Sequence, residues 1–249
     1  MKPKVETEEA VKRIEETIDK EMTREEQQQA RDRDEKETRL EEWQPKTELG
    51  KLVRAKKITD IDEIFKSGQK ILEAEIVDSL LDLNSDMLNV GQAKGKFGGG
   101  KRRAWRQTQK KTKEGNIATF AVLAVVGNGN GYVGIGIGRA KETLPAREKA
   151  IRQAKLNIMK VNRGCGSFDC SCEEAHSIPF KVEGKCSSVE VVLMPAPQGS
   201  GLVAGDELKK ILKLAGIKDI YSQSWGQKRS TINFAKACIE ALQKTGEFK

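Results

Sequence analysis

Residues 94–113 read KGKFGGGKRRAWRQTQKKTK, and an apolar run, IATFAVLAVV, follows at 117–126. The turn GNGNG at 127–131 and the alternating run YVGIGI at 132–137 come next, and we expect a basic helix at 143–160. Asn-Gly between two β-prone runs is a strong hairpin signal. The stretch 94–160 therefore predicts strands, a hairpin and one packed helix, which is an α+β arrangement.

The segment 94–113 contains nine Lys or Arg residues and no acidic residue. So many like charges repel one another unless a polyanion neutralises them, and a phosphate backbone is such a polyanion. The alternative interpretations of this basic segment are a solvated charged face and a localisation signal. Phe97, Trp105 and the glycines at 98–100 add stacking surfaces and a flexible backbone, which suit RNA grooves and unpaired bases. We therefore predict that the chain binds structured RNA.

Charge is distributed unevenly along the 249 residues. The chain carries a net charge of +8, with 37% hydrophobic and 33% charged residues, but residues 1–42 alone carry a net −5. No apolar run approaches the ~20 residues of a membrane span, and no secretory signal is visible. The five cysteines are odd in number and clustered, which favours a reducing compartment over a disulfide framework. We expect a cytoplasmic protein that does not contact a membrane.

Four segments are predicted along the chain. Residues 1–42 are rich in helix formers but poor in apolar residues, so we expect a solvated helical or disordered extension. The alternative is a helix that docks on a neighbouring protein. Residues 43–92 form a wrap of short helices, the first capped by Thr47, with a brief strand near 87–90. An RNA-binding domain at 93–162 and a C-terminal α+β domain at 163–249 complete the chain.

Within the RNA-binding domain, residues 104–113 are expected to pair with 117–126 through a turn at 113–116. Thr143 should cap the following helix. The side chains expected to face inward from this helix are Leu144, Ile151, Ala154 and Ile158.

In the C-terminal domain we expect strands at 178–182, 189–194 and 219–224. Gly216 should end the first helix, and Ser230 or Thr231 should cap the last one. The inward-facing residues expected on the two helices are Leu208, Ile211, Leu212 and Ala215, followed by Ile232, Ala235, Ile239 and Leu242.

Three enzyme signatures fail on inspection. Gly129, Gly131 and Gly134 match the spacing of a dinucleotide fingerprint, but an alternating strand follows where that motif needs a helix. The loop 197–205 resembles the start of a kinase phosphate loop, but it continues with Val203, Ala204 and Gly205 where those kinases have serines. A single His and the absence of a nucleophile elbow argue against nucleophilic catalysis. We predict that the protein is not an enzyme.

Cys165, Cys170, Cys172 and His176 lie within twelve residues of one another. Three thiols and one imidazole are the soft ligands of a tetrahedral structural zinc ion. Cys186 is a possible substitute ligand, and reduced cysteines without a metal are the plain alternative. Because four ligands leave no open position, a catalytic zinc is not expected.

Several stretches resemble the universal small-subunit ribosomal protein S-five family, in its archaeal and eukaryotic branch. The similarity covers roughly residues 43–245. It is carried by WQPKTELG at 43–50, KEGNIATF at 113–120, VVGNGNGYVGIGIGRAKE at 125–142, NRGCG at 162–166, PAPQGSGLVAG at 195–205 and LAGIKD at 214–219.

This resemblance implies a domain like a double-stranded-RNA-binding domain, followed by the S-five C-terminal domain. It implies a structural role in the small ribosomal subunit, rRNA binding near the mRNA entry channel, and effects on assembly and decoding accuracy. The implied partners are mRNA and the neighbouring proteins S-two, S-three, S-four and S-eight. The alternatives are a free RNA-binding regulator and a kinase-fold enzyme.

Charge and the resemblance together define the predicted RNA-binding residues. Where bacterial relatives carry Gly-Gly-Arg in the first hairpin loop, this chain has Glu114, Gly115 and Asn116. The predicted RNA-binding residues are Lys101, Arg102, Arg103, Arg106, Lys110, Lys111, Lys113, Asn116, Arg139, Lys141 and Arg163.

Overall fold

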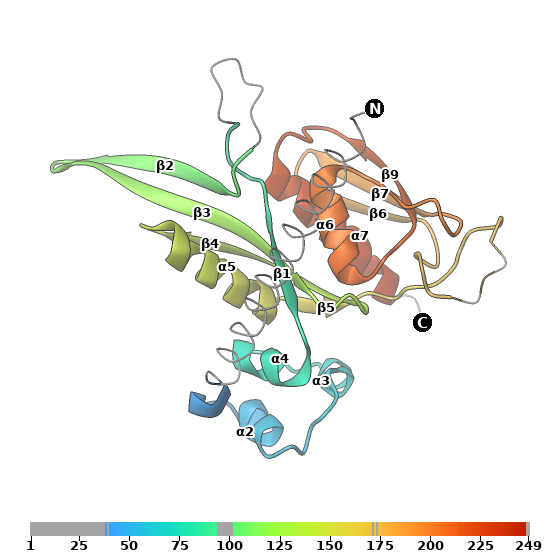
Figure 1. Cartoon of the computed structure of the whole chain (residues 1–249), viewed down its shortest axis with the longest axis horizontal. Coiled ribbons are helices and arrows are strands. Elements are labelled where there is room, and N and C mark those ends of the chain that lie inside the picture. The colour runs from blue at the N-terminus through green and yellow to red at the C-terminus, as the bar shows by residue number, and fades with distance from the viewer. Residues whose placement is uncertain (1–37, 39, 94–101, 171, 173, 248–249) are drawn as a thin grey trace, which may run out of the picture.

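Two sheets with covering helices form the body of the protein in this computed structural model, which describes residues 38, 40–93, 102–170, 172 and 174–247 (Figure 1). Most of the extension predicted at 1–42, and residues 94–101 of the basic stretch, lie outside the described residues. Among the described residues, no helix is both long and apolar enough to cross a membrane. The architecture is α+β, as the sequence predicts.

The first sheet contains five strands rather than the three expected. Its strands are β1 Asn84–Leu88, β2 Trp105–Thr112, β3 Gly115–Gly127, β4 Tyr132–Ala140 and β5 Ile158–Lys160. The order is β1-β3-β4-β5, and every pairing is antiparallel. β2 pairs with residues 115–122 of β3, while β1 pairs with residues 123–127. The β2–β3 hairpin therefore projects beyond the body (Figure 1).

Helix α5, Thr143–Leu156, covers one face of this sheet. Ala146, Ala150 and Ala154 face inward, and Leu144 is 64% exposed, so the predicted inward residue Leu144 is wrong. The reason is the glycine face of β4. A Cβ built on Gly138 would lie 2.0 Å from the Ala146 carbonyl oxygen, so the helix backbone packs directly on the strand.

Two further predictions for this helix are corrected by the structure. Glu142 is its N-cap, and Thr143 is the first helical residue. The helix ends at Leu156, because Ile158 already belongs to β5 and pairs with Gly134. Ile158 is buried as expected, but from a strand.

The second sheet has the order β6-β7-β9-β8, and only the β8–β9 pairing is parallel. Helices α6 and α7 cover one of its faces (Figure 1). The elements are β6 Val182–Cys186, β7 Val189–Pro195, β8 Leu202–Val203, α6 Asp206–Ala215, β9 Ile220–Trp225 and α7 Thr231–Glu247.

The predicted helix faces here are largely confirmed. Leu208, Ile211, Leu212 and Ala215 are fully buried, and Gly216 ends α6 with a φ of 81°. On α7, Ala235 and Leu242 are fully buried, and Ile232 and Ile239 pack against the same core. The strand predicted at 178–182 is wrong, because β6 begins where that prediction ends.

Three short helices form the predicted wrap, at Glu48–Arg54 (α2), Ile61–Ser67 (α3) and Ala74–Leu80 (α4). The Thr47 cap is confirmed, since its hydroxyl accepts a hydrogen bond from the Gly50 amide at 3.0 Å. Asp62 of α3 joins the wrap to the first sheet. It accepts hydrogen bonds from the Tyr132 hydroxyl at 2.6 Å and from the Lys160 ammonium at 2.5 Å.

One apolar core runs through both halves of the body. Leu123, Val125 and Val133 of the first sheet pack in the same cluster as Leu193 and Leu212 of the second half. The inner part of the first sheet is therefore covered on both faces, by α5 and by the C-terminal half. No described residue of the C-terminal half packs in the same way on the second face of its outer part, the β2–β3 hairpin.

Candidate nucleic-acid interface and metal centre

Three of the predicted RNA-binding residues share one face of the first sheet. Arg106 lies opposite Ala121 on β3, and Ala121 lies opposite Arg139 on β4. Directly paired residues point to the same side, and side chains alternate along a strand, so Lys110 belongs to this side as well. All three cations are exposed. We call this surface, formed by Arg106, Lys110 and Arg139, the cationic face.

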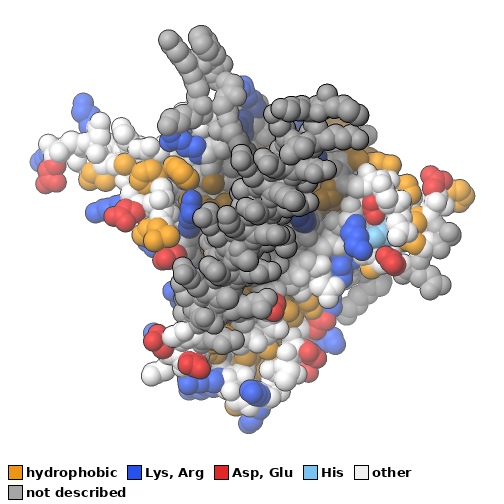
Figure 2. Space-filling model, viewed as in Figure 1, with side chains coloured by type: hydrophobic (Ala, Val, Ile, Leu, Met, Phe, Trp, Pro, Cys, Tyr) orange, Lys and Arg blue, Asp and Glu red, His pale blue; other side chains and the backbone are white. Residues whose placement is uncertain are grey.

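The hairpin tip carries a second group of predicted residues. Thr112 pairs with Gly115, so the turn consists of Lys113 and Glu114, and the φ of 118° at Gly115 explains the glycine there. Lys111 lies opposite Asn116. Figure 2 shows Lys and Arg side chains on the projecting hairpin and an acidic side chain near its end. The tip is thus positive, with one carboxylate in the turn.

Arg102 and Arg103 lie at the base of the hairpin. The Arg102 guanidinium donates a hydrogen bond to the Thr231 hydroxyl at 3.3 Å, and the Arg103 carbonyl accepts one from the Gly91 amide at 2.8 Å. Arg102 is exposed and Arg103 is half-buried. Lys101 lies outside the described residues.

The last two predicted RNA contacts lie at the ends of elements. Lys141 is exposed between β4 and α5. Arg163 donates hydrogen bonds to the Gly216 carbonyl at 3.3 Å and to the Asn130 side chain. These two bonds tie the 127–131 turn to the end of α6. A guanidinium has five N–H donors, so this bridge does not use up its capacity.

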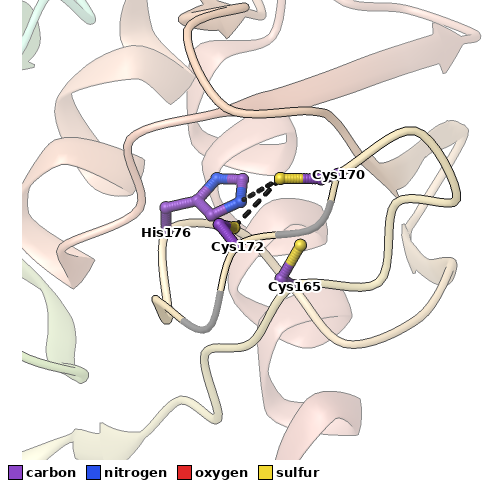
Figure 3. A group of neighbouring side chains, drawn as sticks. All are labelled: Cys165, Cys170, Cys172 and His176. Atoms are coloured by element: carbon purple, nitrogen blue, oxygen red, sulfur yellow. Dashed lines mark hydrogen bonds between the residues drawn. The ribbon is translucent and has the colours of Figure 1, made fainter.

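The four predicted zinc ligands converge in the loop between β5 and β6 (Figure 3). The sulfur atoms of Cys165, Cys170 and Cys172 and a ring nitrogen of His176 all lie within 4.8 Å of one another. Cys170 Sγ lies 2.9 Å from Cys172 Sγ and 3.6 Å from His176 Nε2. Cys186, the predicted substitute, is on β6 and is not part of this group.

His176 is held from behind by Asp219. Its Nδ1 lies 2.9 Å from Asp219 Oδ2, and both side chains are almost completely buried. Asp219 Oδ1 also accepts a hydrogen bond from the Gly201 amide at 2.8 Å. The amides of Lys218 and Asp219 donate to the His176 carbonyl. A carboxylate on one ring nitrogen leaves the other nitrogen facing the thiols, which is the usual orientation of a metal-binding histidine.

Contact between two of the thiols shifts their pKa values in opposite directions. The hydrogen bond between Cys170 and Cys172 lowers the pKa of Cys170 to about 6 and raises the pKa of Cys172 to about 12. Cys170 is thus the thiol of this pair that loses its proton first. Metals bind thiolates, so the donor set suits a tetrahedral cation of the zinc type.

Backbone contacts fix the ends of the metal-site loop. Gly164 and Ser177 exchange two backbone hydrogen bonds at 2.9 Å each. A Cβ on Gly166 would lie 2.1 Å from the Pro179 carbonyl oxygen, so the chain crosses itself closely there. Pro179, which cannot donate to a ladder, and these crossings explain why residues 178–181 do not form the predicted strand.

The two glycine motifs have structural roles among the described residues. Residues 132–140 continue as β4, and its glycines admit α5, which confirms the hairpin interpretation over the dinucleotide one. The loop 197–205 is bound to Asp219, the residue before β9, and to β9 itself through the pairing of β8. Sequence reasoning missed Asp219, because its partner His176 lies 43 positions earlier and no local pattern links them.

Comparisons with known proteins agree with this architecture. Residues 104–162 match the family described as Ribosomal protein S5, N-terminal domain, and residues 184–249 match Ribosomal protein S5, C-terminal domain. The chain is 52% identical over 206 residues to the Small ribosomal subunit protein uS5 of Nanoarchaeum equitans, covering 82% of this chain and 88% of the relative. The protein of the same name from Methanobrevibacter smithii is 50% identical over 211 residues, covering 84% and 92%. That from Pyrobaculum islandicum is 50% identical over 208 residues, covering 83% and 96%.

Proposed function

This chain belongs to the ribosomal protein S5 family, and on that premise we propose that it is a structural constituent of the small ribosomal subunit that binds small-subunit rRNA. The chain matches 88–96% of the length of the three relatives above, and each of them is named as a small ribosomal subunit protein. Its place is then the cytoplasm, within the subunit. The role is to neutralise and position RNA, with no catalytic step.

The observation that carries the rRNA contact is the cationic face. Arg106 and Lys110 of β2 and Arg139 of β4 point the same way on either side of β3, where the C-terminal half does not cover the sheet. Cations placed side by side favour a phosphate backbone, because its negative charges relieve their repulsion. Lys111, Lys113 and Asn116 at the tip extend the proposed contact, as do Lys141 after the outer end of β4 and Arg163 beside the 127–131 turn at the inner end.

A charge-removal series tests this contact. The triple variant Arg106→Gln, Lys110→Gln, Arg139→Gln should weaken binding to a small-subunit rRNA transcript and lower the salt dependence of log K by about three units, roughly one for each lost phosphate contact. The matched control, Lys181→Gln, Lys185→Gln, Lys236→Gln, removes the same charge from exposed positions of the C-terminal half. Equal salt slopes for the two triple variants would reject the cationic face.

Two other functions remain open to direct tests. A free RNA-binding regulator would wash off small subunits in high salt, whereas a structural protein co-sediments with them. A kinase-fold enzyme would bind a nucleotide at the 197–205 loop in a titration. The geometry does not favour the kinase, since the Gly201 amide of that loop is bound to Asp219, the residue before β9.

Finer parts of the proposal rest on the family alone. They are the position near the mRNA entry channel, the effects on assembly and decoding accuracy, and contacts with mRNA and proteins S-two, S-three, S-four and S-eight. The proposal also includes the four predicted segments of the chain, with boundaries after residues 42, 92 and 162. Cross-linking of assembled subunits tests the neighbours directly.

We further propose that Cys165, Cys170, Cys172 and His176 hold one structural zinc ion. Four donor atoms within 4.8 Å of one another, with a carboxylate behind the histidine, support this assignment. When bound, the ion supplies a cross-link between the start and the end of the loop. Asp219 keeps the ring of His176 oriented, and the backbone pair at Gly164 and Ser177 closes the loop beneath it.

Metal content tests this assignment. Mass spectrometry of the purified protein under reducing conditions should find one zinc per chain, and Cys170→Ser should lose it. Cys186→Ser is the matched control, because that thiol is also half-buried but lies outside the group. Zinc retained in Cys170→Ser, or no zinc in the wild type, contradicts the proposal.

A further inference from the structure

A groove of about 1080 Å³ lies where the N-terminal and C-terminal halves meet. One wall is the first part of β2 with the preceding residues, and the other is the segment 229–232 at the start of α7. Residues 90–93 complete the lining. The groove is therefore built by elements more than one hundred positions apart in the sequence.

Arginine dominates the charge of this groove. Its described lining residues include Arg102, Arg103, Arg106 and Arg229, and no Asp or Glu is among them. The other polar lining residues are neutral: Gln92, Gln107, Thr108, Gln109, Ser230 and Thr231. Four guanidinium groups without a carboxylate define a site for a polyanion with several phosphates.

A hydrogen-bonded path holds the two walls in a fixed relation. Arg102 donates to the Thr231 hydroxyl, which in turn donates to the Asn89 carbonyl at 3.4 Å. The Asn89 amide donates to the Glu207 carboxylate at 2.9 Å. The groove is thus already formed in the free protein, so RNA binding need not assemble it.

The groove is continuous with the cationic face. Arg106 belongs to both, Thr108 follows it on the same side of β2, and Lys110 comes next just beyond the groove. A phosphate backbone lying along the cationic face therefore reaches Arg229 by following β2 toward the body. The first backbone N–H groups of α7, a helix of 17 residues, lie at that end.

We propose that this groove binds the continuation of the rRNA backbone that lies along the cationic face, with Arg229 of the C-terminal half as its far anchor. The inference rests on the proposed rRNA-binding function and extends the interface from the projecting hairpin onto the other half of the molecule. One RNA strand would then clamp both halves through Arg106 and Arg229.

A single substitution at the far anchor tests the groove. Arg229→Gln in the full chain should weaken binding to a small-subunit rRNA transcript on the order of tenfold near 0.1 M salt. It should also lower the salt slope by about one. Lys228→Gln is the control, because this exposed neighbour carries the same charge and does not line the groove. Equal effects of the two substitutions would overturn the proposal and leave the cationic face intact.

A cross-link identifies the occupant independently. A photoreactive phenylalanine analogue at Gln107, an exposed lining residue, should attach to rRNA in the protein–RNA complex. Attachment to the acidic segment 1–42 of this chain, or to another protein, would overturn the inference, while loss of binding in the cationic-face triple variant would still support the proposed function. A wild-type chain that binds no rRNA would contradict both.

Discussion

Both halves of the molecule pack helical cover on a largely antiparallel sheet, but they fill the space between helix and sheet differently. Under α5, three glycines of β4 face three alanines, and the backbones approach until no Cβ would fit. Under α6 and α7, leucine, isoleucine and valine side chains fill the interface, with Gly184 as one close approach. Helix–sheet packing in the N-terminal half rests on close backbone contact, and in the C-terminal half it rests on the burial of large side chains.

The difference decides how each half responds to change. An interface of glycine and alanine buries few large side chains, but it cannot accept any added atom, because the backbone itself is the neighbour. An interface of large side chains tolerates small shifts and loses stability when a side chain is shortened. The first two predictions below test this contrast, and a third tests how the wrap is attached; they run from the largest expected effect to the smallest.

Adding one methyl group to the glycine face should have the largest effect. In Gly136→Ala the new Cβ would lie 2.2 Å from the Ala154 amide nitrogen and 2.3 Å from the Ala150 carbonyl oxygen. Because α5 must move away, we expect a loss of more than about 4 kcal/mol in the free energy of unfolding. Denaturant titration measures it, and hydrogen exchange should show the loss first in β3, β4 and α5.

The control for this substitution is Gly246→Ala. Outside its own helix, the one described atom within 4 Å of an added Cβ at that helical glycine is the Lys160 carbonyl oxygen, at 3.5 Å. Alanine there should leave stability unchanged or raise it by up to about 1 kcal/mol. If Gly136→Ala behaved like Gly246→Ala, the close packing of α5 would be wrong.

Shortening a large side chain in the C-terminal half should have an intermediate effect. Leu212 is fully buried in the shared core, so Leu212→Ala should cost about 2–5 kcal/mol through lost burial and the cavity left behind. Leu144→Ala on the outer side of α5 is the matched control, with an expected change within about 0.5 kcal/mol. A similar loss of stability in both variants would contradict the exposed position of Leu144 on α5.

Removing the ion pair between Asp62 of the wrap and Lys160 of the first sheet should have the smallest effect on the free energy of unfolding. Hydrogen bonds from Lys160 and then Tyr132 lower the pKa of Asp62 below its ordinary value of 3.8. The folded state thus binds the proton more weakly than the unfolded chain. Asp62 therefore stabilises the fold fully above that ordinary pKa, and this contribution is lost as the pH falls through the lowered one.

Asp62→Asn should accordingly cost less than about 1 kcal/mol at pH 7, since the carboxylate is 34% exposed. Denaturant titrations of the variant and the wild type should differ at pH 7 and converge as the pH falls below the lowered pKa. A difference that persists at the most acidic pH would assign the effect to lost packing between α3 and Tyr132 rather than to charge.

Several elements were predictable because their signals are local. The Asn-Gly turn, the apolar run of β3, the Thr47 cap and the C-terminal glycine of α6 each act within a few residues. β6 was misplaced because Gly184 interrupts its alternation, and a strand of five residues gives little other signal. The inward face of α5 was misassigned because its partner is a glycine surface, which selects alanine over leucine.

The same distinction between local signals and long-range packing applies to the candidate sites. The four metal-binding candidates lie within twelve residues, so spacing alone was enough to propose them, and the structure brings their donor atoms together. The carboxylate that orients His176 and the arginine that completes the groove lie just before β9 and just before α7, far along the chain. Their roles depend on which strands are neighbours, and that is not written in any local pattern.

The sequence by itself determined the class of the fold, the positive surface, the family resemblance and the set of soft metal ligands. These follow from composition, charge and short-range spacing, which a chain carries whether or not it is folded. Only the tertiary structure decided that Arg106 and Arg139 share one face, that Asp219 supports His176, and that both halves line a single groove. Each depends on the register of paired strands and on a core common to both halves, and both arise only when distant segments pack together.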